Sequence, residues 1–189
     1  IMGKTGSGKS TILSLLTRIH DVSGNSKIKI DGHNLTEYDL YHLRNSMSIV
    51  PQDPFLFSDS IKNNIKFGKE DATDEEIITA AKMAVVDDNI QSFTNKYETI
   101  LGERGITLSG GQKQRVSIAR AIIKEAPILI LDDCLSAVDT ETEEKIVNNF
   151  KKIFNKKTTI IVTHRASAAI NANKIIVLDS GRSVQEGTH

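Results

Sequence analysis

A short stretch near the start of the chain, Gly3 to Thr11, constrains the fold more than any other feature. It fits the phosphate-loop pattern of glycine, four residues, glycine, lysine and serine or threonine. Glycines let the backbone turn so that successive N–H groups converge on phosphate oxygens, while Lys9 adds positive charge and Ser10 a hydroxyl for Mg²⁺. The pattern predicts a magnesium–nucleotide site formed by Gly3, Lys4, Thr5, Gly6, Ser7, Gly8, Lys9, Ser10 and Thr11.

Two other structures are compatible with this glycine-rich start. One is an ordinary helix, expected from about Ser10 to Ile19, that is capped by a glycine turn and binds nothing. The other is a dinucleotide site, but Thr11 stands where its third glycine is needed, so hydride transfer is disfavoured. A phosphate loop follows a strand, and only Ile1 and Met2 precede Gly3. We therefore expect the chain to be a fragment of a longer protein.

Charge and cysteine content exclude several classes of function. Lys plus Arg and Asp plus Glu both number 24, so no global basic field attracts nucleic acid. The single cysteine, Cys134, excludes an internal disulfide and fits a small buried side chain in a reducing compartment. Apolar runs such as Ile128 to Leu131 are far shorter than the roughly 18 residues of a membrane span. The chain itself is expected to be soluble, with any membrane link through a partner or further chain.

Apolar and β-branched runs predict an α/β fold with a mostly parallel sheet. Buried strands are expected at Met47 to Val50, Ile128 to Leu131 and Thr158 to Thr163. A hairpin edge is expected around Asp31-Gly32, and two strands joined by a turn are expected over Lys174 to Glu186. Helices, including one from about Thr140 to Phe154, are predicted between the strands.

Consecutive helical patterns predict a helical insertion in this core. Asp74-Glu75-Glu76 begins a pattern that continues to Val86, and Asp88 to Phe93 follows without a strand. We expect one domain over 1–189, with a core lobe at about 1–52 and 125–189 and a helical lobe at about 53–124. In the loop Pro54 to Phe57, two aromatic residues would mark a docking patch if exposed and belong to the lobe's core if buried.

Polar side chains follow three predicted strands at the carboxyl end, where ligands bind in open α/β sheets. Gln52 follows the first strand and could reach Mg²⁺ or the attacking water, although a plain loop glutamine is equally compatible. Asp132 is expected to hold Mg²⁺ through water, and Asp133 to polarise the attacking water. An aspartate that caps the next helix is the alternative. His164 follows the third strand, where a structural role is the alternative.

A second anion site is predicted at Leu108 to Gln112, at the start of a helix expected over Lys113 to Lys124. Ser109 and Gln112 form a capping box, and the two glycines between them permit close approach of the backbone to a phosphate. A capped helix without a ligand is the alternative. Since both anion sites cannot easily hold one nucleotide from the same side, the second is expected to serve another copy or a partner.

Taken together, these motifs resemble the nucleotide-binding domain of ATP-binding-cassette transporters. Leu-Ser-Gly-Gly-Gln before a hydrophobic strand that ends in Asp is the family's highly specific signature, and the match covers nearly the whole chain. The resemblance implies that two such domains enclose two ATP molecules head to tail. Each nucleotide then lies between one phosphate loop and the opposing signature. The motifs are Gly3 to Thr11, Gln52, Leu108 to Gln112, Ile128 to Asp132, Ser136 to Asp139 and His164.

The resemblance also implies the cofactors and the residues around them. ATP and Mg²⁺ are the expected cofactors, and a second such domain is the expected partner. Ser10, Gln52 and Asp132 are implied as the magnesium ligands. Catalytic roles are implied for Asp133, His164 and Gln52. Residues implied at the nucleotide are the phosphate loop, Gln52, Asp132, Asp139 and His164, with Ser109, Gly110, Gly111 and Gln112 directed toward the partner's ATP.

Two further stretches resemble the exporter branch of the family. They lie at Leu56 to Ile65 and at Gly102 to Gly105. The resemblance implies that the regions Gln52–Ile65 and Gly102–Gly105 meet the cytoplasmic ends of transmembrane helices. The chain would then power export of a drug, lipid or peptide from the cytoplasmic face of a membrane. The aromatic residue that stacks on adenine in the family lies upstream of the phosphate loop, outside this chain.

One departure from the family pattern concerns Asp133, where the family usually has Glu. The shorter side chain retracts the carboxylate by roughly 1.5 Å, and a misplacement of about 1 Å can lower a rate about a hundredfold. Hydrolysis at the chain's own phosphate loop is therefore expected to be weak, as in one subunit of heterodimeric multidrug exporters. A homodimer is the alternative assembly, because the chain retains His164, which some subunits with a weak site lose.

Two readings from other classes stay open. A soluble cassette ATPase that acts on DNA or ribosomes is disfavoured by the neutral charge and by the absence of heptad arms between Lys9 and Ser109. A regulatory module that binds ATP with little turnover remains compatible with Asp133.

Overall fold

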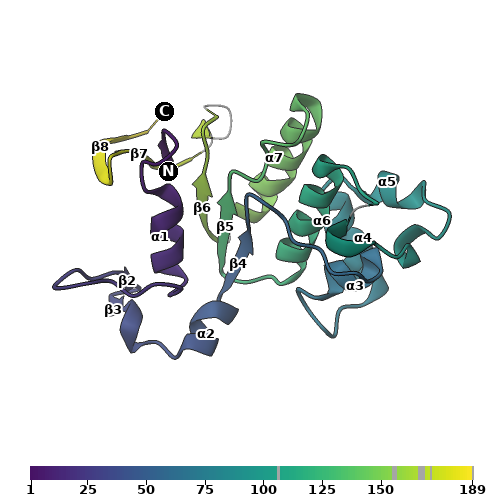
Figure 1. Cartoon of the computed structure of the whole chain (residues 1–189), viewed down its shortest axis with the longest axis horizontal. Helices are drawn as coiled ribbons and strands as arrows, with labels where there is room; N and C mark the ends of the chain where they lie inside the picture. Colours follow the sequence, from purple (N-terminus) through teal and green to yellow (C-terminus); the bar gives the residue numbers. More distant parts are fainter. Residues whose placement is uncertain (106, 155–156, 166–168, 171, 189) are drawn as a thin grey trace. The chain divides into compact units, whose positions relative to one another are not determined.

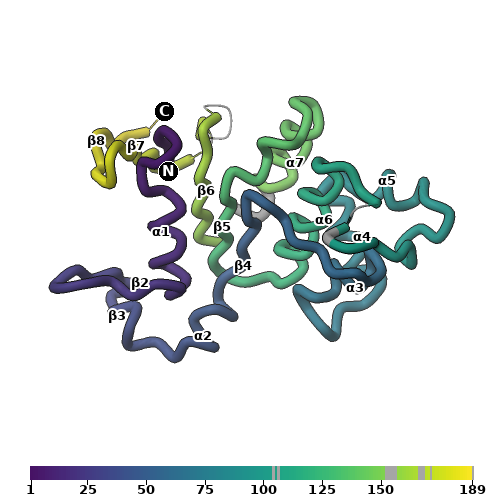
Figure 2. Tube along the Cα trace, viewed as in Figure 1, coloured from purple at the N-terminus to yellow at the C-terminus, as the bar shows by residue number. Residues whose placement is uncertain are grey.

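The computed structural model describes residues 1–105, 107–154, 157–165, 169–170 and 172–188. It divides into two compact units, Ile1–Met47 with Ile160–His189, and Ser48–Thr159. Figures 1 and 2 follow the path of the chain. The boundaries of these units differ from those of the core and helical lobes predicted from the sequence, and the division into those lobes stays a prediction.

The first unit contains a sheet that brings the two ends of the sequence together. Strand β1 (Met2–Gly3) pairs in parallel with β7 (Ile175–Asp179), which pairs antiparallel with β8 (Arg182–Gly187). The strand order is β1-β7-β8. Helix α1 (Lys9–Leu16) follows the phosphate loop. It ends before the predicted Ile19, because Arg18 takes a left-handed φ of 49° that no helix continues.

The first unit also contains the predicted hairpin. Strands β2 (Lys29–Ile30) and β3 (His33–Asn34) are antiparallel, and the turn residues Asp31 and Gly32 both have positive φ, as a tight hairpin requires. A short 3₁₀ helix, η1 (Leu35–Glu37), leads to α2 (Leu40–Asn45).

The second unit combines strands with helices. Strands β4 (Met47–Val50), β5 (Ile128–Asp132) and β6 (Thr158–Val162) are neighbours in that order. Strand β5 ends at Asp132, and Asp133 follows it. The helical elements are α3 (Ile61–Lys66), α4 (Asp74–Met83), α5 (Asp87–Gln91), η2 (Lys96–Glu98), η3 (Glu103–Gly105), α6 (Gly110–Ile123) and α7 (Thr140–Phe154).

Helix α6 forms the centre of the helical part. Its residues Val116, Ile118 and Ala119 are buried, and α3 and α4 both pack against it. Serine or threonine caps begin these helices: Ser60 caps α3, and Thr73 caps α4 in a full capping box with Glu76. Well-capped helices around a buried centre make α6 a rigid element.

One further sequence prediction is confirmed. Cys134 is buried, and burial raises the pKa of its thiol to about 12, so it is a structural side chain. Within the described residues, no helix has both the length and the apolar character needed to cross a bilayer.

Candidate functional site

The phosphate loop presents open backbone groups at the start of α1. Gly6 and Gly8 have φ of 81° and 101°, a region that glycine occupies without strain. Gly8 is the N-cap of α1, and no side chain caps the helix. The N–H groups of the first turn therefore have no intrahelical acceptor, and the positive end of the helix dipole favours an anion there.

Gly3 and Gly6 have different local reasons to be glycine. A Cβ on Gly3 would clash with the carbonyl oxygen of Leu178 in β7 and lie 2.5 Å from Ser7 Oγ. At Gly6, none of the described residues comes within 4 Å of the corresponding position. Gly3 therefore permits close packing of the loop against β7, whereas Gly6 leaves space for a ligand.

Lys9 and Ser7 are the polar side chains buried inside the loop. Lys9 Nζ donates hydrogen bonds to the carbonyl oxygens of Gly3 at 2.7 Å and Lys4 at 2.8 Å. The Ser7 hydroxyl is buried, and it has no hydrogen-bond partner among the residues that the structure describes. A buried polar group left unpaired costs about 1–3 kcal/mol, and a phosphate oxygen would satisfy it. The donors of this loop therefore fit a phosphate group.

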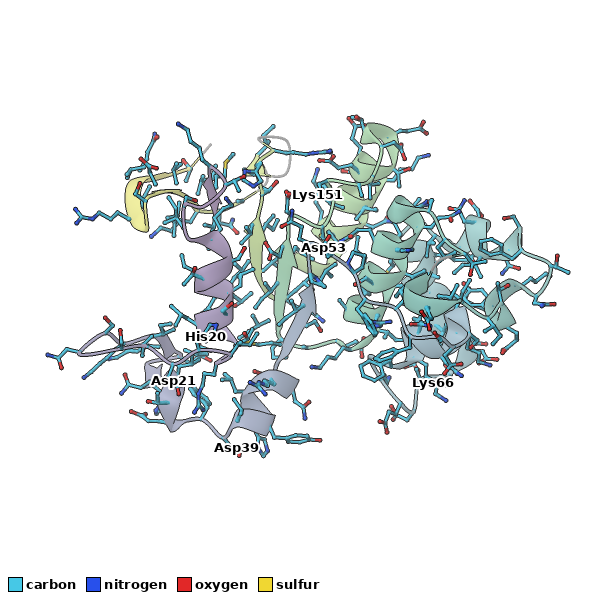
Figure 3. The ribbon with its side chains drawn as sticks, viewed as in Figure 1. His20, Asp21, Asp39, Asp53, Lys66 and Lys151 are labelled. Atoms are coloured by element: carbon cyan, nitrogen blue, oxygen red, sulfur yellow. The ribbon has the colours of Figure 1, made fainter. Side chains whose placement is uncertain are left out.

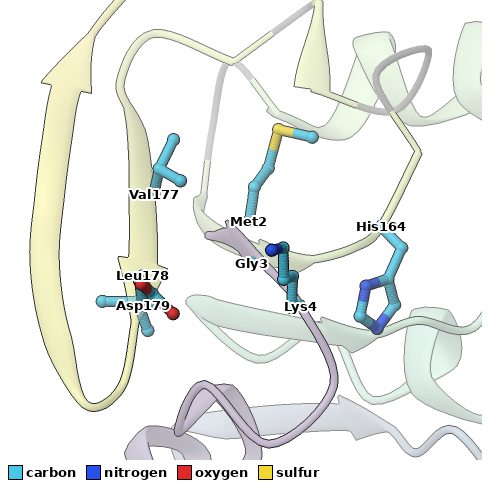
Figure 4. Close-up of a pocket in the computed structure, with 7 residues that line it drawn as sticks. All are labelled: Met2, Gly3, Lys4, His164, Val177, Leu178 and Asp179. Atoms are coloured by element: carbon cyan, nitrogen blue, oxygen red, sulfur yellow. The ribbon is translucent and has the colours of Figure 1, made fainter.

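His164 lies beside the start of the phosphate loop. Met2 and Thr163 form a parallel bridge, and the main-chain N–H of Thr163 donates to the carbonyl of Ile1. His164 and Lys4 face a common cavity of ≈ 460 Å³ (Figure 4). The structure thus brings the predicted histidine next to the predicted loop. The cavity is lined by Met2, Gly3, Lys4, His164, Val177, Leu178 and Asp179.

In the second unit, two carboxylates lie at the carboxyl end of the buried strand β5. Leu129 to Leu131 are buried, whereas Asp132 and Asp133 are partly exposed. Asp133 has a left-handed φ of 43°, and its carbonyl accepts a hydrogen bond from Ser136 N at 3.2 Å. Aspartate tolerates this conformation better than most residues. The strand end therefore presents both acids at a tight turn.

Gln52 follows β4, the neighbour of β5, and its side chain is exposed, as is that of the next residue, Asp53 (Figure 3). The preceding Pro51 is tied to helix α6, because Gln114 Nε2 donates to its carbonyl oxygen at 3.0 Å. Gln114 is buried. Sequence reasoning missed this contact, which joins residues far apart in the chain.

The predicted capping box is present at the start of α6. Ser109 Oγ accepts from Gln112 N at 3.2 Å, and Gln112 Oε1 accepts from Ser109 N at 2.9 Å. Ser109 and Gly110 are exposed. A Cβ on Gly110 would have no atom within 4 Å, whereas one on Gly111 would lie 2.9 Å from the carbonyl oxygen of Ala137. Gly110 therefore leaves space for a ligand, and Gly111 allows α6 to pack on the turn after β5.

Alanine substitutions should separate the two glycines. We expect Gly111→Ala to lower the free energy of unfolding by about 1–3 kcal/mol, because its methyl group would press on a backbone oxygen. Gly110→Ala should leave stability unchanged or raise it slightly, since alanine is the better helix former. Urea unfolding of both variants measures the difference. Equal stability of the two variants would contradict the packing role of Gly111.

Asp139 caps α7, and Arg115 supports the signature region from within the chain. The Asp139 carboxylate accepts from Thr142 N at 2.9 Å at the start of α7, and this hydrogen bond is the main cause of its lowered pKa. Arg115 donates to the carbonyl oxygen of Gly111 at 3.2 Å and to Asn89 Oδ1 at 2.9 Å. Asp139 thus caps a helix, and its role at a nucleotide stays a prediction. Arg115 was missed because its contact with Asn89 joins residues far apart in the sequence.

The predicted site residues fall into two sets. The phosphate loop and His164 lie together in the first unit. Gln52, the signature residues, Asp132, Asp133 and Asp139 lie in the second unit.

Comparisons with known proteins agree with the motifs. Residues 1–136 match the ABC transporter family. The chain is 47% identical over its whole length to the ATP-dependent lipid A-core flippase of Legionella pneumophila, of which it spans 32%. It is also 47% identical to ATP-binding cassette sub-family B member 6 of Xenopus tropicalis, of which it spans 22%.

A solved structure extends the agreement to the fold. All of the chain superposes with a TM-score of 0.95 and 42% identity on 33% of a bacterial Atm1-family ABC exporter with ATP bound. This similarity confirms the predicted α/β class. Because most of the sequence matches one family, and its phosphate loop and signature have the expected local geometry, the chain belongs to the ABC transporter family and is one of its ATPase domains.

Proposed function

We propose that this chain is the ATP-hydrolysing motor domain of a membrane exporter and acts at the cytoplasmic face of the membrane. The observation that carries the proposal is the whole-chain similarity to an ABC exporter with ATP bound. The chain spans about a third or less of the relatives, so transport itself would require further domains. Those further domains would determine which class of substrate is transported.

The phosphate loop would hold the triphosphate. Bound Mg-ATP supplies the phosphoryl group that is transferred to water, together with the cation that neutralises its charge. The first-turn N–H groups of α1 and the unpaired Ser7 hydroxyl would donate to phosphate oxygens. Lys9 would turn from its carbonyl partners toward the phosphates. Ser10, Gln52 and Asp132 are the proposed magnesium ligands, a set of oxygen donors that suits this ion.

Asp133 and His164 would act on the reacting groups. Asp133 would accept a hydrogen bond from the attacking water, and His164 would hold the γ-phosphate from beside the loop. Because Asp133 is one methylene shorter than glutamate, we expect slow turnover at this phosphate loop. The partner domain would then provide the faster site, which makes a heterodimer the proposed assembly.

The signature region would complete the partner's site. Ser109 and Gly110 are exposed at the start of α6, where backbone groups can approach a phosphate. In a head-to-tail pair, these groups would contact the nucleotide held by the other domain.

An aromatic patch supports docking of the transmembrane partner. The patch consists of Phe55, Phe57 and Phe67, which are 54%, 38% and 63% exposed. The rings of Phe55 and Phe57 pack edge to face with centroids 5.2 Å apart, while the intervening Leu56 is fully buried. Two of the three residues lie in the region Gln52–Ile65, which we propose, with Gly102–Gly105, as the contact to the transmembrane domain. Exposed aromatic side chains are typical of such interfaces.

ATP turnover and transport by the complete exporter test this function. Reconstituted in lipid vesicles, it should hydrolyse ATP and move substrate across the bilayer. Chelation of Mg²⁺ should stop both activities, since phosphoryl transfer needs the cation. ATP hydrolysis by the chain without any membrane partner at the rate of the assembly would instead favour a soluble ATPase. Binding of ATP by an assembly that neither hydrolyses nor transports would favour a regulatory module.

A further inference from the structure

Helix α6 carries a partly buried cation, Arg120, near its C-terminal end, away from Ser109. The guanidinium of Arg120 donates three hydrogen bonds: Nε to the carbonyl oxygen of Asn64 at 2.7 Å, Nη2 to Asn64 Oδ1 at 2.7 Å, and Nη1 to the carbonyl oxygen of Phe55 at 2.8 Å. All three acceptors lie in the segment that contains the aromatic patch. Arg120 therefore joins the signature helix to that segment directly.

Asn64 extends the grip of Arg120 to the loop before α3. Asn64 is fully buried. Its Oδ1 accepts from Phe57 N at 2.8 Å, and its Nδ2 donates to the carbonyl oxygens of Phe57 at 3.1 Å and Ser60 at 3.0 Å. Phe57 itself lies in a loop rather than in a strand, and these side-chain bonds hold its backbone. Arg120 and Asn64 thus form one hydrogen-bonded unit.

The same guanidinium lies over two rings of the aromatic patch. Arg120 Cζ is 5.4 Å from the centroid of the Phe57 ring and 5.6 Å from that of Phe67. The distances are typical of cation–π contacts, which are strengthened when the cation is desolvated. Burial lowers the pKa of Arg120 to about 10, so it remains protonated at neutral pH.

Gly68 allows this close packing. A Cβ at Gly68 would clash with the carbonyl oxygen of Arg120 and lie 2.8 Å from Ile123 Cγ2. The backbone after α3 therefore contacts α6 at the turn that carries Arg120. The backbone packing at Gly68 and the three hydrogen bonds of Arg120 therefore hold the same turn of α6 against the segment that contains the aromatic patch.

We propose that Arg120 is the positioning residue that makes the aromatic patch and the signature helix move as one body. A displacement of the patch by the transmembrane partner would then carry α6 with it and shift Ser109 and Gly110 at the other end of the helix. A packed helix transmits such a shift because its buried side chains cannot rearrange continuously. The identity of the partner rests on the proposed function, whereas the link between patch and helix rests on the contacts above.

Arg120→Lys is the informative variant. Lysine keeps the positive charge and much of the length but loses the planar fork that reaches Asn64 and Phe55 together. Arg120→Met removes the charge as well. Lys82→Met, at an exposed cation of α4, is the matched control for charge removal in the same unit.

Hydrogen exchange of the 189-residue chain tests the link itself. We expect Arg120→Lys to accelerate amide exchange in residues 55–67 by roughly tenfold or more, as expected for losing hydrogen bonds to a charged donor. Exchange in α4 should stay at the wild-type rate, as in Lys82→Met. Wild-type exchange at 55–67 in Arg120→Lys would overturn the proposed link.

Transport per ATP hydrolysed tests the coupling role. In the complete exporter in lipid, Arg120→Lys should lower this ratio severalfold, while Lys82→Met keeps it. A purely structural role would lower transport and ATP turnover in proportion and leave the ratio unchanged, which would overturn the coupling role. A wild-type assembly that does not transport would overturn the proposed function and, with it, the coupling role.

Discussion

Replacing Ser109 with arginine in the assembled exporter is expected to lower ATP turnover by roughly a hundredfold or more, the loss typical of a removed transition-state donor. Ser109 and Gly110 are exposed at the start of α6, and nothing lies within 4 Å of a Cβ placed on Gly110. A long charged side chain would fill this space and keep the backbone N–H groups from the partner's γ-phosphate. Turnover is measured as ATPase rate in lipid.

The matched change at Asp133 should have a much smaller effect. If the partner domain holds glutamate at the equivalent position and the faster site, Asp133→Asn should change turnover by less than about twofold, because it acts on the slow nucleotide only. Asp133→Glu should raise turnover modestly at most. The left-handed φ of 43° at this position also suits aspartate better than glutamate.

The comparison between these variants decides between two assemblies. Turnover that falls as far in Asp133→Asn as in Ser109→Arg would show that Asp133 is a working base. The chain would then be better described as a homodimer subunit, and the asymmetric assembly would be wrong. Arginine at Ser109 also removes the capping box, so unfolding of each variant must be measured alongside.

Lys9→Ala is expected to weaken ATP binding by roughly a hundredfold, the range expected for losing charge-assisted hydrogen bonds. Two effects contribute. The phosphates lose the buried ammonium of the loop, and the carbonyl oxygens of Gly3 and Lys4 lose their donor. Calorimetric titration of the purified protein with Mg-ATP measures the affinity.

A control variant distinguishes the loss of any lysine charge from the loss of the lysine in the phosphate loop. Lys27→Ala removes an exposed lysine outside the loop and should leave the affinity within about twofold, since exposed charges are screened by solvent. Thermal unfolding of Lys9→Ala reports how far the loop depends on the two carbonyl contacts. Unchanged ATP affinity in Lys9→Ala would refute the assignment of the phosphate loop.

Local patterns in the sequence predicted much of this protein. The capping box at Ser109 and Gln112, the buried strand before Asp132 and helix α7 from Thr140 to Phe154 are present as expected. Each depends on residues a few positions apart, through helical periodicity, capping hydrogen bonds or a run of apolar side chains. Such signals survive in the sequence because the atoms that create them are close along the chain.

Other features depend on contacts between distant residues, and only the tertiary structure decided them. The pairing of β1 with β7 places the Leu178 carbonyl against Gly3, so that this glycine serves packing as well as a ligand. Likewise, the carbonyl oxygen of Ala137 lies against Gly111, so that Gly111 serves packing, whereas Gly110 leaves space for a ligand. The sequence left the exposure of Phe57 open, and in the folded chain its ring is partly exposed with Arg120 over it. No local pattern encodes these contacts, because each joins segments that meet only after the chain has folded.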